Sequence, residues 1–226
     1  MKTSKFISIS YLIFLFGGIF VLFLAAKIHS NHEDAINWTW QEKALKSFSI
    51  VVAGPGAEFT LKDAQYPRIG LSFQKGDTCL FPSYGIRNDT LFVYSYSGKV
   101  KPKVLTIFCS GIKTIVGKEN STILMEQFRD DSLVVKLEKA KFRYFPNNAN
   151  LNRFSMILLA SQSNINIGAA NFNMLEVNLK QSQLTGRTMS VHSLSGVLND
   201  HSSLVMGHTN KIRLDADSTS TYHVFK

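Results

Sequence analysis

The chain has 226 residues, of which 45% are hydrophobic and 18% are charged, a balance that is typical of a folded globular domain and excludes a disordered chain. Its formal net charge is +9, and the basic residues are spread along the sequence except for a short cluster of Lys99, Lys101 and Lys103. A nucleic-acid-binding domain is expected to gather its basic residues into a patch with interleaved aromatic residues, so nucleic acid is not predicted as a partner.

The first predicted element is an uncharged, apolar segment from Phe6 to Ala26, which follows Lys2 and Lys5. As an α-helix this segment would be about 31 Å long, which matches the hydrocarbon core of a bilayer. We therefore predict a transmembrane anchor at residues 6–26, with residues 1–5 in the cytoplasm because basic residues favour that side. The alternative is a cleaved signal peptide, although the apolar region of a signal peptide is usually shorter. Both interpretations predict that the rest of the chain is exported to the periplasm or the cell exterior.

Residues 27–46 are polar and of mixed charge, and we expect them to form a tether between the anchor and the folded domain. Trp38 and Trp40 lie in this tether. Their rings suit either the headgroup level of a membrane or packing against the first coil of the domain, and the sequence leaves both open.

Residues 47–226 are predicted to form one all-β domain. Alternating apolar residues between turn-forming residues predict short strands at 48–52, 57–61, 69–73, 91–94, 104–107, 112–116 and 123–125. No apolar pattern with helical spacing follows residue 47.

From Leu133 onward a short pattern recurs, in which alternating apolar residues are followed by a small residue. The small residues are Ala140, Ser163, Ser182, Ser202 and Thr219, at spacings between 17 and 23 residues. A β-sandwich would place equivalent positions in different surroundings, whereas stacked coils place them in the same surroundings, so the repeat predicts a β-solenoid. The small residues are then expected at inward corners of successive coils. Val177 and Leu179 should be buried between the coils that hold Leu158 and Val197.

Several segments of the domain resemble the GIN-domain proteins, also called the "putative auto-transporter adhesin head domain" family, of Bacteroidetes-type cell envelopes. They are the strands at 48–52 and 57–61, the segment 88–93 and the repeats after Ile107, so that the resemblance spans residues 46–226. Family members usually carry a Ser-Gly-Ser-Gly-like corner, for which Leu194-Ser195-Gly196 and Cys109-Ser110-Gly111 are the closest matches here. The resemblance implies an exported β-solenoid with an adhesive or scaffold role and no established chemistry.

The sequence lacks the recognised catalytic motifs, and we predict no catalytic, cofactor-binding or metal-binding residues and no cofactor. Cys79 and Cys109 lack metal-ligand spacing and are interpreted either as one disulfide or as buried free thiols. Asp215 and Asp217 are expected to point from one strand into solvent, with Asp200 one coil earlier. The histidines are interpreted as surface residues.

The candidate recognition surface consists of outward-facing amide side chains, whose regular arrays suit saccharide binding but suit plain solvation equally well. They are Gln162, Asn164, Asn166, Asn171, Asn173, Asn178, Gln181 and Gln183.

Taken as a whole, the sequence predicts a single-pass, membrane-anchored, non-catalytic cell-envelope protein. Its β-solenoid would serve as an adhesion, binding or scaffold module, with the membrane and an envelope glycan or protein as partners. The alternative is an envelope polysaccharide-processing enzyme on a β-helix scaffold, which should show clustered acids in a groove.

Overall fold

The structure is a computed structural model that describes residues 14–25, 27, 38–75, 80–97, 102–127, 129–146 and 153–225. The chain divides into two compact units. The first comprises Met1–Thr39 with Gln74–Gly76, and the second comprises Trp40–Phe73 with Asp77–Lys226.

The first unit contains a helix at residues 14–25. Among the described residues, no helix combines the length and the apolar composition that spanning a membrane requires. The predicted anchor at 6–26 includes residues 6–13 and 26, which lie outside the described residues, as do the predicted cytoplasmic residues 1–5.

The second unit is all-β. Its described residues form a β-solenoid and the strands that flank it. The strands are β1 (Trp38–Ala44), β2 (Ile50–Ala53), β3 (Glu58–Asp63), β4 (Arg68–Gln74), β5 (Tyr84–Arg87), β6 (Thr90–Val93), β7 (Val104–Cys109), β8 (Thr114–Gly117), β9 (Thr122–Met125), β10 (Ser132–Glu138), β11 (Lys141–Tyr144), β12 (Phe154–Ser161), β13 (Asn164–Ile167), β14 (Asn171–Lys180), β15 (Gln183–Asn199), β16 (Ser203–Ala216) and β17 (Thr221–Val224).

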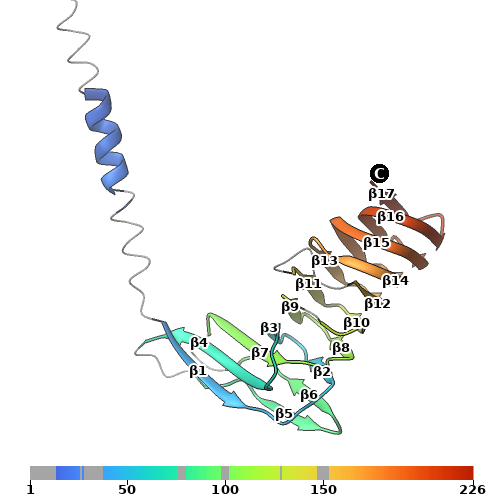
Figure 1. The fold of residues 1–226 in the computed structure, drawn as a ribbon, viewed down its shortest axis with the longest axis horizontal. Coiled ribbons are helices and arrows are strands. Elements are labelled where there is room, and N and C mark those ends of the chain that lie inside the picture. Colours follow the sequence, from blue (N-terminus) through green and yellow to red (C-terminus); the bar gives the residue numbers. More distant parts are fainter. Residues whose placement is uncertain are drawn as a thin grey trace, which may run out of the picture. The chain divides into compact units, whose positions relative to one another are not determined.

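Each coil of the solenoid places one strand on each of two parallel sheet faces. The first face contains β8, β10, β12, β14 and the later parts of β15 and β16. The second face contains β9, β11, β13, the early parts of β15 and β16, and β17. From β8 to β17 the coils follow one another in chain order (Figure 1). The all-β solenoid predicted from the repeat is therefore confirmed.

The N-terminal end of the stack departs from chain order. Strand β2 pairs in parallel with both β6 and β8, and β3 pairs in parallel with both β7 and β9. The coil that comes first in the sequence is therefore enclosed by coils that come later. Antiparallel strands flank this end, since β4 pairs with β7 and β5 pairs with β6.

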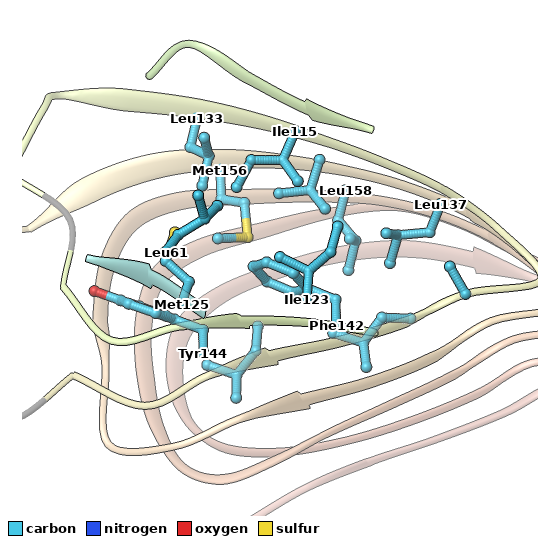
Figure 2. Packing of buried hydrophobic residues seen from close by; sticks show 14 of the residues in the cluster. Leu61, Ile115, Ile123, Met125, Leu133, Leu137, Phe142, Tyr144, Met156 and Leu158 are labelled. Atoms are coloured by element: carbon cyan, nitrogen blue, oxygen red, sulfur yellow. The ribbon is translucent and has the colours of Figure 1, made fainter. Parts of the chain in front are cut away.

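The core lies between the two faces, where side chains from β8, β10 and β12 meet those from β9 and β11 (Figure 2). Parallel pairing places equivalent residues of successive coils in register, apart from shifts at Phe154/Ser155 and Gly186/Ser190. One such row on the first face contains Leu133, Met156, Leu175, Leu194 and Ile212. A row on the second face contains Phe142, Ile165, Leu184, Leu204 and Tyr222. Ile212 and Tyr222, in the last strands of the stack, are exposed, whereas the other members of the two rows are buried. The buried rows supply the apolar area that no single coil could provide.

Val177 and Leu179 are buried between the coils that hold Leu158 and Val197, as predicted, but Val197 itself is only half-buried. Val177 pairs with Leu158 on one side, but its partner on the other side is Gly196, and the buried residue of this coil is Leu198. The corner at residues 200–202 contains two consecutive residues with positive φ, Asp200 and His201, and is longer than the corner at 181–182. Because side chains alternate between faces, one extra corner residue reverses which strand residues point inward.

Strand β1 begins within the range expected to be a tether. Its Trp40 ring packs so closely on Gly70 that a Cβ there would lie 2.1 Å from the indole. The ring also meets Phe108 edge to face at a centroid distance of 6.1 Å. The Trp40 Nε1 donates to the Glu42 carboxylate at 2.7 Å. This hydrogen bond, together with the neighbouring Arg68, lowers the pKa of Glu42. Of the two placements considered for the tryptophans, Trp40 therefore packs against the domain.

Candidate functional site

A backbone feature common to most corners places a small residue inside the solenoid. In these corners a residue with positive φ comes directly before the small residue. The pairs are Gly56 with Ala57, Asn120 with Ser121, Lys139 with Ala140, Gln162 with Ser163, Gln181 with Ser182, and His201 with Ser202. The small residues are buried, whereas the side chains before them from Asn120 onward line the outer surface.

The predicted corner residues Ala140, Ser163, Ser182 and Ser202 lie in successive coils and are joined by hydrogen bonds. The Ala140 amide donates to Ser163 Oγ at 3.1 Å, and the Ser163 amide donates to Ser182 Oγ at 3.0 Å. The Ser182 amide donates to Ser202 Oγ at 3.3 Å. We call this row the serine ladder. Each hydroxyl also donates to a carbonyl of its own coil, at 2.7 Å for Ser163, 2.8 Å for Ser182 and 2.6 Å for Ser202.

Thr219, the last predicted corner residue, is not part of the serine ladder. The Ser202 amide donates to Ser220 Oγ at 3.1 Å, whereas Thr219 is exposed and its hydroxyl accepts from the His201 amide at 3.0 Å. The corner at residues 217–220 is longer than the preceding ones, so the residue directly before the next strand is Ser220. The inward corner residue is therefore the one directly before the next strand. It does not lie a fixed number of residues after the preceding apolar residue.

Corner length explains where a serine is required. In the long corners 54–57 and 118–121 the amides of Ala57 and Ser121 donate to carbonyls of their own corner, Gly54 and Lys118. In the short corners 139–140, 162–163 and 181–182 the amide lacks such a bond and donates to a hydroxyl of the next coil. The corner that follows a long corner can therefore carry alanine, as Ala140 does.

Ser121 supports this rule from the other direction. Ser121 lies in the coil that stacks on the long corner 54–57, since β9 pairs with β3. The Ala57 amide of that corner already donates to the Gly54 carbonyl, so it does not need the Ser121 hydroxyl. The Ser121 Oγ is buried and has no hydrogen-bond partner among the described residues.

The outer side of the corners is hollowed into a polar groove of about 810 Å³, which we call the corner groove. Two amide pairs bridge neighbouring coils along it. Gln162 Nε2 donates to Gln181 Oε1 at 2.8 Å, and Asn164 Nδ2 donates to Gln183 Oε1 at 3.3 Å. Paired amides keep further donor and acceptor capacity facing solvent, which suits a ligand that is rich in hydroxyl groups.

The other predicted amides do not join this array. Asn171, Asn173 and Asn178 belong to β14 on the first face. Asn166 lies on the second face beside Thr185 but does not line the groove.

Lys139, Lys141 and His201 also line the corner groove, although they were not predicted as part of the recognition surface. The signal was present, since Lys139 and His201 directly precede small corner residues of the repeat.

The aspartates near the C-terminal corner have structural roles. Asp215 is exposed, as predicted, but Asp217 lies beyond the end of β16, in the corner. Its carboxylate accepts from the Asp200 amide at 2.6 Å and from the Thr219 amide at 3.0 Å. These hydrogen bonds, the one from Asp200 first, hold the pKa of Asp217 well below its ordinary value. The prediction that Asp217 is a solvated strand residue is therefore wrong, because the strand ends at Ala216 and the side chain closes the turn.

No group of three or more His, Cys, Asp or Glu side chains within the described ranges is arranged to hold a metal ion. His192 and His208 are joined through Asn210, at 3.2 Å and 2.9 Å. Asp200 forms an ion pair with Lys180 at 3.5 Å.

Cys109 is a buried free thiol, and its predicted alternative partner Cys79 lies outside the described residues. Burial, followed by the nearby carboxylates of Asp63 and Asp130, raises the pKa of the Cys109 thiol to about 12. A protonated, buried thiol is a poor nucleophile and metal ligand.

No protein-family model matches the chain, and no curated protein is similar to it. Among solved structures, it is similar to a "putative adhesin" from Bacteroides fragilis NCTC 9343, at 12% identity over 83% of this chain and 97% of that one, with a TM-score of 0.47. A "putative adhesin" from Parabacteroides merdae ATCC 43184 is 12% identical over 84% of this chain and 97% of that one, with a TM-score of 0.37. A "Putative lipid binding protein" from Parabacteroides distasonis ATCC 8503 is 9% identical over 84% and 97%, with a TM-score of 0.36. At these identities and TM-scores the likenesses carry no argument about the activity of this chain, and membership of the GIN-domain family stays a prediction.

Proposed function

We propose that the chain is a non-catalytic binding module of the cell envelope, whose solenoid binds a glycan along the corner groove. The observation that carries the proposal is the pair of amide bridges, Gln162 with Gln181 and Asn164 with Gln183, which hold polar groups at regular intervals along the outer corners. Strands of successive coils are about 4.8 Å apart, so the groove presents the same chemistry repeatedly to a linear polymer.

The acidic residues support a binding role over hydrolysis. The Asp217 carboxylate is engaged in closing its corner, and Asp200 pairs with Lys180. General acid–base catalysis by a glycosidase needs two carboxyl groups facing one substrate, one of them with a raised pKa. Asp217 has a lowered pKa.

Calorimetric titration of the full-length chain with linear envelope oligosaccharides, neutral and acidic, tests the proposal. A double variant, Gln162→Ala with Gln181→Ala, should weaken binding, whereas the matched control Asn178→Ala on β14 should not. Absence of binding to every oligosaccharide, or equal losses in both variants, would contradict it. Release of new reducing ends from an oligosaccharide would instead support the alternative enzyme.

The envelope location is part of the same proposal and rests on the uncharged segment 6–26 behind Lys2 and Lys5. In intact spheroplasts, added protease should degrade the domain from Lys46 onward. Mass spectrometry of the membrane-extracted protein should find residues 1–5. A protein that begins near Lys27 would replace the anchor with a cleaved signal, and protease resistance would refute export.

A further inference from the structure

A second cavity, which we call the tyrosine pocket, lies apart from the serine ladder and has a volume of about 690 Å³. Its floor includes Glu58 and Thr60 of β3 and Thr122 of β9, and Tyr94, Tyr96 and Arg143 also line it.

Tyr94 is held in place by the backbone beneath it. A Cβ at Gly54 would lie 3.2 Å from Tyr94 Cδ1, so the missing side chain lets the ring pack directly on this corner. The Gly54 amide also donates to the carbonyl of Val93, the residue before Tyr94, at 2.8 Å. Nevertheless the tyrosine is 49% exposed. A fixed, half-exposed aromatic ring is a suitable platform for the apolar face of a sugar ring.

Basic side chains connect the tyrosine pocket to the corner groove. Arg143 lines the pocket and Lys141 lines the groove, and both are exposed on the outer side of β11. Neither forms an ion pair with any residue that the structure describes. Lys139, also in the groove, lies 3.9 Å from Glu119, at the limit of an ion pair. Glu58 is the one carboxylate among the described residues that line either hollow. The charge balance therefore favours an anionic ligand.

Strand register places lining residues of the two hollows side by side, since Thr122 of the tyrosine pocket pairs with Lys141 of the corner groove. Glu58 pairs with Thr122, Thr122 with Lys141, Lys141 with Asn164, and Asn164 with Gln183. These residues belong to successive coils and form one row across the second face. A linear ligand that follows this row would pass from the tyrosine pocket, past the cations of β11, to the amide bridges.

The pairing of the floor strands favours a glycan over a peptide. Strand β3 is paired on both sides, with β7 and β9, and β11 is paired with β9 and β13. An extended peptide that binds by strand addition needs a free sheet edge, which this surface does not offer. Side-chain amides, hydroxyls and an aromatic ring instead match the hydroxyls and ring faces of sugars.

We propose that the tyrosine pocket and the adjoining row bind an acidic linear glycan, with a sugar ring on Tyr94 and its carboxylate at Arg143 and Lys141. This inference rests on the proposed function, since it names the class of glycan that the same surface takes.

The test uses the full-length chain and a linear oligomer of galacturonic acid, with the fully methyl-esterified oligomer of the same length as the neutral probe. The acidic oligomer should bind more tightly, and its affinity should fall as salt concentration rises. Arg143→Gln should weaken binding of the acidic oligomer about tenfold, equivalent to about 1.4 kcal/mol, and leave the ester unchanged. Tyr94→Ala should weaken both probes, and Tyr94→Phe should restore them. The control Lys136→Gln, on the outer side of β10, should change neither.

Equal binding of acid and ester, or no effect of Arg143→Gln, would overturn the inference. If the ester binds and depends on Gln162 and Gln181 alone, the proposed function stands without it. If no oligosaccharide binds, whether acidic or neutral, both fail. Equally tight binding of poly-glutamate would show that charge alone is recognised, which also overturns the inference. Circular-dichroism melting of each variant verifies that it is folded.

Discussion

Replacing Ser182 with alanine should destabilise the domain, while the same change at Ser121 should not. Both serines are buried at inward corners, and both changes remove one hydroxyl group. Ser182 Oγ accepts from the Ser163 amide at 3.0 Å and donates to the Lys180 carbonyl at 2.8 Å. Ser121 Oγ has no partner among the described residues.

The expected magnitude follows from those contacts. Loss of the hydroxyl's own hydrogen bond costs about 1 kcal/mol, and a buried amide left without an acceptor costs about 1–3 kcal/mol. Partial relaxation of the corner reduces the sum, so we expect a loss of about 2–3 kcal/mol for Ser182→Ala. For a domain of this size each kcal/mol corresponds to about 2–4 °C in Tm, which predicts a fall of about 4–12 °C. Ser121→Ala should stay within about 0.5 kcal/mol of the parent, because it removes an unpaired buried polar group.

Thermal unfolding followed by circular dichroism, together with urea unfolding, measures both variants against the parent. A Ser182→Ala loss below about 0.5 kcal/mol would place it among ordinary surface substitutions. Such a result, or equal losses in the two variants, would refute the reasoning that short corners depend on a hydroxyl from the next coil.

Gly196→Ala should destabilise the domain by more than about 2 kcal/mol or prevent folding, because a Cβ there would lie 1.8 Å from the Val177 carbonyl oxygen and the φ of this residue is +144°. Soluble yield and urea unfolding measure the effect, and a near-neutral result would contradict the close packing of β14 on β15. Asp217 has a pKa below its ordinary value of 3.8, so its stabilising effect should be complete above that pH and be lost as the pH falls further. Asp217→Asn should therefore flatten the decline of Tm below about pH 4, and an unchanged profile would show that the carboxylate is not held as described. Cys109, with its pKa raised to about 12, should resist alkylation by iodoacetamide at pH 8 until the domain is unfolded. Peptide mapping measures the extent of alkylation, and rapid labelling of the native protein would contradict the burial of this thiol.

The sequence by itself determined the fold class, because a strand-built repeat imposes the same demand on each coil. Alternation of apolar residues identified the inner positions Leu158, Val177 and Leu179, and the small residues located the corners at Ser163, Ser182 and Ser202. It also indicated the amides of the corner groove, since corner residues that face outward recur at the same point of the repeat.

Corner length and strand pairing were decided only by the tertiary structure. Because the corner 200–202 has one added residue, the buried strand residue before it is Leu198 and not Val197. Because the last corner is long, the hydroxyl that accepts from the Ser202 amide belongs to Ser220 and not to Thr219. Alternation of side chains along a strand does not reveal such shifts. In a strand rich in Ser and Thr, the residues that face inward and those that face outward have similar side chains.

Nor does the order of residues show that β2 and β3 lie between later coils, because pairing with β6 and β7 depends on a chain reversal through β4 and β5. That reversal brings Tyr94 and Arg143 to one pocket, although they are far apart in the chain. Spacing along a sequence reports contacts within one coil and between consecutive coils. A site assembled across non-consecutive coils exists only once the chain has folded.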